Sequence, residues 1–130
     1  MSRAPLIAIV EDDEFVRESM TRLMRSLGYT AQTFPSAADF LASRRLDETA
    51  CLIADIHMPG ITGVELYACL IEAGHKIPTI LVTAYPDEAT RARALKDGIV
   101  CYLLKPFDEN DLMECVRKAV EGAKPAAGNS

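Results

Sequence analysis

Short runs of apolar residues recur along the chain, and each is followed by polar residues. Leu6–Val10 and Cys51–Asp55 have the length and composition of strands buried on both faces, and Asp55 closes the second of them. Thr30–Phe34 is more polar, which is typical of an edge strand. Thr79–Thr83 and Ile99–Leu104 complete a set of five expected strands.

The segments between these runs repeat their apolar residues with the period of a helix. In the first, apolar positions fall at i, i+4, i+7, i+8 and i+11, and Gly28 is placed to end the helix. Ser36 with Asp39, and Thr62 with Glu65, have the spacing of capping boxes. The inward-facing residues expected are Val16, Met20, Leu23, Met24 and Leu27, then Leu66, Cys69, Leu70 and Ala73, and in the last helix Leu112, Cys115, Val116, Ala119 and Val120.

The helix expected after Pro86 has the weakest apolar face. Proline and the acids behind it suit a helix start. The apolar face consists only of Ala89, Ala92 and Leu95. We therefore expect this helix to be held least firmly, as an ordinary surface helix or, as we favour, a movable signalling face.

Strands and helices alternate without a repeat, which predicts an α/β sandwich around a parallel sheet. The 130 residues suit one domain, which we place at residues 1–122, and the Gly-, Pro- and Ala-rich residues 123–130 predict a flexible tail or linker stub. No apolar run approaches the roughly 20 residues of a membrane span, and the first is too short for a signal peptide. We expect a cytoplasmic protein that makes no membrane contact.

The net charge and the cysteine spacing argue against a nucleic-acid interface and a zinc site. The net charge is −5 and no block of Lys and Arg stands out, which argues against direct nucleic-acid contact by this domain. The cysteines have no CxxC or zinc-knuckle spacing. We expect buried, reduced thiols that act as small hydrophobes at Cys51, Cys69, Cys101 and Cys115.

Polar side chains follow the ends of four expected strands. Glu11 and Asp12 follow the first strand and Asp55 ends the third, while Thr83 ends the fourth and Lys105 follows the fifth. Because the carboxyl ends of parallel strands share one edge of a sheet, we expect these side chains to lie together.

Three carboxylates at one edge would repel one another. At about 5 Å and an effective dielectric near 20, each pair costs on the order of 3 kcal/mol. Lys105 offsets one of the three negative charges, and a divalent cation would neutralise the rest. Oxygen ligands favour Mg²⁺, which often binds through one or two carboxylates and phosphate oxygens. The charges predict a magnesium-assisted phosphoryl site without deciding which carboxylate is the nucleophile.

Four motifs together resemble the receiver domain of two-component response regulators, most of all the nitrogen-fixation and nodulation regulator type. The resemblance covers about residues 5–121, in the order and spacing of the family. It implies a flavodoxin-like (βα)5 three-layer sandwich with strand order 2-1-3-4-5. The motifs are Ile9-Val10-Glu11-Asp12-Asp13, Asp55-Ile56-His57-Met58-Pro59-Gly60-Ile61-Thr62-Gly63, Thr83-Ala84 and Lys105-Pro106-Phe107.

The resemblance also implies which residues receive the phosphoryl group and the metal. Asp55 would accept the phosphoryl group from a phosphohistidine of a histidine kinase or phosphotransfer protein. Asp12, Asp55 and the backbone carbonyl of His57 would bind Mg²⁺, with Glu11 in its outer shell. The spacing from Asp12 to Arg17 selects Glu11 and Asp12 as the acidic pair, and Glu11 departs from the more usual aspartate.

The resemblance implies a switch on the neighbouring strands. Thr83 and Lys105 would bind phosphoryl oxygens, and Tyr102 would be a rotating aromatic switch. The Lys105-Pro106 bond would be cis. The output face would be the fourth helix, fifth strand and fifth helix, through which a homodimer is plausible, and the module would catalyse only its own phosphorylation and dephosphorylation.

Two other classes share parts of this pattern. A phosphatase of the haloacid dehalogenase type also uses an aspartate after a strand, but needs a second one two residues on, where this chain has His57. A flavodoxin-like flavin binder needs a phosphate-cradling loop rich in Ser, Thr and Gly after the first strand, and the acids there oppose it. We expect His57 to act through its backbone, and in the resembled family its position and that of Tyr85 flank the phosphoryl group and tune its hydrolysis.

Overall fold

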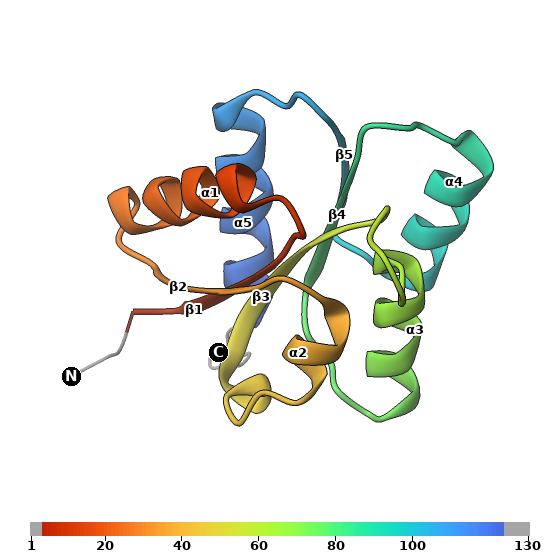
Figure 1. The fold of residues 1–130 in the computed structure, drawn as a ribbon, viewed down its shortest axis with the longest axis horizontal. Coiled ribbons are helices and arrows are strands. Elements are labelled where there is room, and N and C mark those ends of the chain that lie inside the picture. The colour runs from red at the N-terminus through yellow and green to blue at the C-terminus, as the bar shows by residue number, and fades with distance from the viewer. Residues whose placement is uncertain (1–3, 124–130) are drawn as a thin grey trace.

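A parallel sheet forms the middle layer of the molecule (Figure 1). The computed structural model describes residues 4–123, so the predicted tail, apart from Ala123, lies outside the described residues. The strand order β2-β1-β3-β4-β5 confirms the predicted fold class and strand order. The strands are β1 (Leu6–Val10), β2 (Thr30–Phe34), β3 (Thr49–Asp55), β4 (Thr79–Thr83) and β5 (Cys101–Leu104).

Helices cover both faces of this sheet (Figure 1). One face carries α1 (Glu14–Ser26) and α5 (Glu109–Ala123), and the other carries α2 (Ala37–Leu41), α3 (Gly63–Glu72) and α4 (Glu88–Asp97). A short 3₁₀ helix, Leu46–Glu48, leads into β3. No helix in residues 4–123 combines the length and the apolar character that a membrane crossing requires.

The continuous apolar runs of the sequence become strands with a core on each side. In β1, Ile7 and Ile9 pack with the residues of α1 and α5, while Ala8 and Val10 pack with those of α2, α3 and α4. This alternation follows from the two-residue period of a strand. A run without polar residues is required because both faces are buried.

Capping hydrogen bonds fix the starts of α1 and α3. Asp13 caps α1, and its side chain accepts from the amides of Phe15 and Val16. Thr62 and Glu65 form the predicted capping box before α3. Asp13 fixes the start of α1 shortly after β1, and Thr62 fixes the start of α3 after the loop that follows β3.

The buried face of α3 differs from the prediction. Leu66 and Leu70 are buried as expected, but Cys69 and Ala73 are exposed and Tyr67 is buried instead. The Tyr67 hydroxyl donates a hydrogen bond of 3.2 Å to the backbone carbonyl of Asp97 at the end of α4. A tyrosine can bury its ring while its hydroxyl keeps a hydrogen bond. The periodicity of apolar residues alone did not predict that Tyr67 faces inward.

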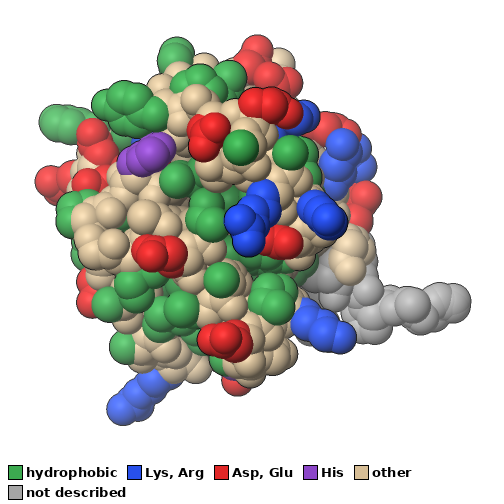
Figure 2. Space-filling model, turned by 90° about the vertical axis from the view of Figure 1, so that its right-hand side faces the viewer, with side chains coloured by type: hydrophobic (Ala, Val, Ile, Leu, Met, Phe, Trp, Pro, Cys, Tyr) green, Lys and Arg blue, Asp and Glu red, His purple; other side chains and the backbone are tan. Residues whose placement is uncertain are grey.

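The buried face of α4 was also predicted wrongly. Ala89, Ala92 and Leu95 are exposed, and Ala94 is the residue of this helix that is buried. Alanine gains little from burial, so an alanine-rich pattern does not decide which face packs inward. Figure 2 shows the side of the molecule that carries α3 and α4, where hydrophobic side chains are interspersed with acidic and basic ones. The expectation of a lightly buried helix is nevertheless confirmed.

The cysteines depart from the predicted set of buried, reduced thiols. Cys51 is buried and free, as expected, but Cys69 is free and exposed. Cys101 and Cys115 form a disulfide between β5 and α5. Their separation of 14 residues gave no signal for this pairing. Their Cα atoms come to 6.1 Å only because α5 folds back against the sheet beside β5.

Candidate functional site

The strand order reverses between β1 and β3, and acidic side chains gather there. From β1 the chain proceeds outward to β2 and then returns to β3 on the other side of β1. Such a reversal opens a crevice at the carboxyl ends of the two strands. Carboxylate oxygens of Glu11, Asp12 and Asp55 lie within 4.8 Å of one another in this place.

Lys105 joins two of the three carboxylates. Its Nζ lies 2.8 Å from Glu11 Oε1 and 2.8 Å from Asp55 Oδ2. Its backbone amide donates to the carbonyl of Thr83, which extends the pairing of β5 with β4, and its bond to Pro106 is cis as predicted. Burial lowers the pKa of Lys105, but its hydrogen bonds to Asp55 and Glu11 and their negative charges outweigh burial and raise that pKa above its ordinary value.

Glu11 is the most deeply buried acid of the cluster, at 1% exposure. Burial raises its pKa, while the hydrogen bond from Lys105 and the backbone hydrogen bond from Asp13 oppose the rise. Arg17 Nη1 donates to the Glu11 backbone carbonyl at 2.8 Å. Arg17, whose spacing from Asp12 set the register of the acidic pair, thus also ties α1 to the residue that directly follows β1.

The loop after Asp55 is held against the strand that it leaves. The amide of His57 donates to Asp55 Oδ1 at 3.1 Å, and the amide of Gly63 donates to the Ile56 carbonyl at 3.1 Å. A Cβ atom at Gly63 would lie 2.6 Å from the Asp55 carbonyl oxygen. Gly63 closes the second motif of the resemblance, but no role was predicted for it. A further signal was its place directly after the capping Thr62, since glycine is a poor helix former.

Thr83 is buried at the end of β4, and its hydroxyl is engaged with the following loop. Its Oγ1 accepts from the Tyr85 amide at 3.0 Å and donates to the Tyr85 carbonyl at 3.3 Å. The Tyr85 ring is 70% exposed and meets the ring of His57 edge to face, with centroids 5.1 Å apart. The two residues that follow Asp55 and Thr83 by two positions are thus in contact.

Tyr102 lies on β5, partly buried against the core that contains Tyr67 and Ala94. Together with Leu104 it forms the β5 wall of a groove of about 290 Å³, and the opposite wall is the start of α4. Tyr102 therefore stands between the packed interior and the α4 surface. On the sheet, Tyr102 pairs with Leu81 of β4, the strand that ends at Thr83.

The acidic cluster fits a divalent cation by its chemistry. Three carboxylates with oxygens inside 4.8 Å form a donor set that suits a hard cation such as Mg²⁺. Lys105 contacts Glu11 and Asp55 and balances one negative charge. Glu11, Asp12 and Asp55 could therefore hold a metal ion at the carboxyl edge of the sheet.

Known proteins resemble this chain along most of its length. A family model of the response regulator receiver domain matches residues 7–117. Nodulation protein W of Bradyrhizobium diazoefficiens is 37% identical over 92% of this chain and 53% of its own length, and response regulator protein TodT of Pseudomonas putida is 34% identical over 98% and 56%. The chain therefore spans little more than half the length of these relatives.

Solved structures agree with the sequence relatives. The response regulator StyR superposes with a TM-score of 0.86 at 36% identity, covering 93% of this chain and 61% of that one. FixJ-N superposes with a TM-score of 0.81 at 31% identity, covering 92% and 96%. The chain belongs to the response regulator receiver domain family, the signalling modules of two-component systems.

Proposed function

We propose that this receiver domain takes a phosphoryl group on Asp55 from the phosphohistidine of a sensor kinase or phosphotransfer protein. One observation carries the proposal: Asp55 lies at the strand-order reversal, hydrogen-bonded to Lys105 and close to two other carboxylates. The relatives support it, since TodT is named a response regulator and others are named transcriptional regulatory proteins. Control of a transcription-regulating partner segment is part of the proposal.

The chemistry is an in-line displacement at phosphorus. A carboxylate oxygen of Asp55 attacks, the phosphorus–nitrogen bond breaks, and the imidazole nitrogen leaves with the bonding electron pair. Asp12, Asp55 and the His57 carbonyl would hold Mg²⁺, with Glu11 in its outer shell. When bound, the ion supplies charge neutralisation for the phosphoryl oxygens.

Lys105 is placed to follow the phosphoryl group as it arrives. Its Nζ already contacts Asp55 Oδ2, so a short movement brings its charge to a phosphoryl oxygen. Charge-assisted hydrogen bonds of this kind are about twice as strong as neutral ones. The lysine thereby exchanges one anionic partner for another without leaving the site.

The switch is an exchange of partners at Thr83. An aspartyl phosphate, if it resembles other phosphoryl groups, carries about −1.5 to −2 charge, and the Thr83 hydroxyl would leave Tyr85 to donate to one of its oxygens. This movement draws the loop before α4 inward, and Tyr102 turns into the space that it vacates. Shifting the population from 1:99 to 99:1 needs about 5.5 kcal/mol, within the reach of a few charge-assisted hydrogen bonds.

The output surface in this proposal is α4, β5 and α5, where a partner or a second copy of the chain would bind. The groove between Tyr102, Leu104 and the start of α4 lies on this surface. This domain would not contact nucleic acid itself, because its net charge is −5.

Labelling with acetyl phosphate and Mg²⁺ tests the proposal. We expect wild-type protein to incorporate phosphoryl label, Asp55→Asn to incorporate none, and the exposed control Asp39→Asn to label as wild type. A chelator should abolish the labelling of wild type and of Asp39→Asn. Label on Asp55→Asn, or sustained turnover of a phosphomonoester by wild type, would contradict the proposal, the second in favour of a phosphatase.

A further inference from the structure

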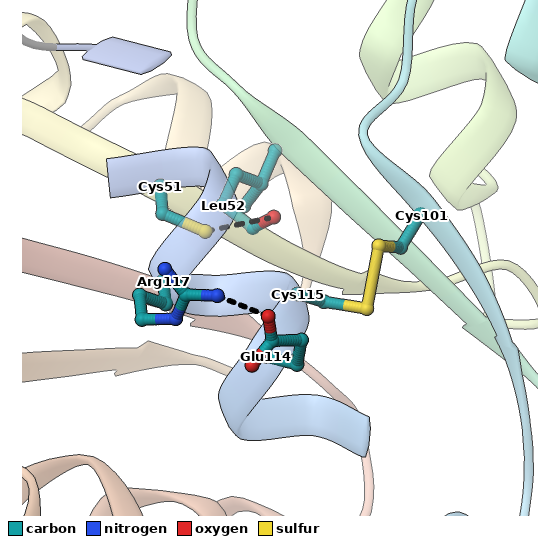
Figure 3. The surroundings of a disulfide bond; sticks show 6 residues. All are labelled: Cys51, Leu52, Cys101, Glu114, Cys115 and Arg117. Atoms are coloured by element: carbon teal, nitrogen blue, oxygen red, sulfur yellow. Dashed lines mark hydrogen bonds and ion pairs between the residues drawn. A yellow bond between two sulfur atoms is a disulfide. The ribbon is translucent and has the colours of Figure 1, made fainter. Parts of the chain in front are cut away.

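Cys101 and Cys115 form a disulfide that the phosphoacceptor chemistry does not use. Cys101 is the first residue of β5, and Cys115 lies in the buried stripe of α5 (Figure 3). Their Cα atoms are 6.1 Å apart, inside the range in which two cysteines can be bridged without moving the backbone. The pair is therefore a built site for a covalent bond.

The bond closes a loop that contains the residues proposed to read the phosphorylation. Tyr102 follows Cys101 directly, and Lys105 lies in the same closed loop. Neighbouring residues of a strand face opposite ways, so Cys101 packs with the α1 and α5 core while Tyr102 packs with the α3 and α4 core. The disulfide thus joins the back of the switch strand to α5.

We propose that Cys101 and Cys115 are a reversible thiol–disulfide modification site that restrains the phosphorylation switch, with small-molecule disulfides of the glutathione type as its oxidant. The inference rests on the proposed function, because the restraint concerns the movement of Tyr102 and Lys105. It assigns the chain a second input, the thiol–disulfide balance of its surroundings.

The exchange is balanced in atoms and electrons. Cys101 is partly exposed and Cys115 is nearly buried, so Cys101 reacts first. Its thiolate attacks one sulfur of the small disulfide, the disulfide bond breaks, and one small thiolate leaves. The Cys115 thiolate then attacks Cys101 Sγ and displaces the second small thiolate. Two electrons pass to the oxidant, and the two cysteine protons end on the two small thiols.

The bond and the switch are coupled because they act on the same strand. The switched state requires Lys105 to follow the phosphoryl oxygens and Tyr102 to turn, while the bond fixes the start of β5 against α5. The oxidised protein should therefore bind a phosphoryl mimic more weakly than the reduced protein. Coupling between two sites is reciprocal, so the mimic should oppose oxidation by the same factor.

The experiment equilibrates the protein in mixtures of glutathione and glutathione disulfide, and maps the bonds by peptide mass analysis after thiol blocking. We expect one intramolecular Cys101–Cys115 bond that added thiol reverses. Cys101→Ser and Cys115→Ala should each abolish it, and the control Cys69→Ser, which removes an exposed thiol on α3, should leave it intact. Two variants on different elements keep the mapping decisive if one of them folds poorly.

Affinity for beryllofluoride with Mg²⁺ is then measured on reduced and oxidised protein. We expect binding to weaken about fivefold or more on oxidation, the lower end of ordinary coupling, and the midpoint of oxidation to shift by the same factor when the mimic is bound. The difference should vanish in Cys101→Ser and persist in Cys69→Ser.

The outcomes separate this inference from the proposed function. Failure of the reduced protein to bind beryllofluoride would count against the phosphoacceptor site while leaving the mapped bond standing. Equal binding by reduced and oxidised protein, or glutathione attached to other cysteines without a Cys101–Cys115 bond, would overturn the inference and leave the phosphoacceptor site intact.

Discussion

Two helices border β5, and they are held very differently. In α5 a continuous stripe is buried, while in α4 only Ala94 among the described residues is buried. The stripe of α5 consists of Leu112, Cys115, Val116, Ala119 and Val120. Because α5 is part of the core, moving it would expose many buried side chains. A movement of α4 would expose few, so we expect α4 to be the helix that moves when the charge at the edge of the sheet changes.

The comparison also locates the fixed end of α4. Gly98, directly after the helix, has φ +118°, and the Tyr67 hydroxyl is bonded to the carbonyl of Asp97. Ala94 lies in the same last turn. The beginning of α4, by contrast, follows the exposed Tyr85 and the loop that Thr83 holds. We therefore expect α4 to move by its beginning and to stay fixed at its end.

The largest predicted effect comes from one substitution made in both helices. Leu112→Ala in α5 should lower the free energy of unfolding by about 2–5 kcal/mol, because it opens a cavity at a fully buried site. Leu95→Ala in α4 should cost about 1 kcal/mol or less, because Leu95 is already 36% exposed. Urea unfolding measures both, and equal losses would refute the contrast between the helices.

A smaller effect is expected at the glycines of the same helices. Gly98→Ala should destabilise the protein by about 1–2 kcal/mol, because the position is left-handed and the new Cβ would stand 2.8 Å from the Tyr67 hydroxyl. Gly122→Ala in α5 meets nothing within 4 Å and should stabilise by up to about 1 kcal/mol. Thermal unfolding distinguishes them, and a neutral Gly98→Ala would mean that the end of α4 is not fixed.

Hydrogen exchange measures the difference between α4 and α5 directly in the folded protein. Amides of α4 should exchange about tenfold or more faster than those of α5, which is about 1.4 kcal/mol in opening free energy. Beryllofluoride with Mg²⁺ should slow exchange at the beginning of α4 and leave α5 unchanged. In Thr83→Ala the slowing should disappear, and its persistence would show that the Thr83 hydroxyl does not transmit the signal.

Much of this molecule is readable from its sequence because burial on both faces demands unbroken apolar runs. β1 and β4 match their predicted bounds, and the strand ends brought Glu11, Asp55 and Lys105 to one edge as expected. The packing of α4 was not readable, because alanines on several faces give no preference. Neither was the Cys101–Cys115 pair, since contact between residues on different elements depends on the crossover geometry.

A last prediction concerns the reactivity of Cys51, a buried free thiol outside that pair. Burial raises the pKa of Cys51 to about 12, so its thiol stays protonated in the folded protein near pH 8. Alkylation of Cys51 should be at least about a hundredfold slower in folded than in urea-unfolded protein, because the thiolate is the reactive form. The exposed Cys69 serves as the control that reacts in the folded state, and rapid folded-state labelling of Cys51 would contradict the packing of β3.

The most direct test of the central claim is to locate the phosphoryl group itself. Protein phosphorylated with acetyl phosphate and Mg²⁺ is treated with borohydride, which reduces an acyl phosphate to the alcohol, and the modified residue is found by peptide mass analysis. We predict homoserine at position 55 and unmodified aspartate at position 12. Modification at Asp12, or phosphoryl label on His57 with Asp55 intact, would contradict the account.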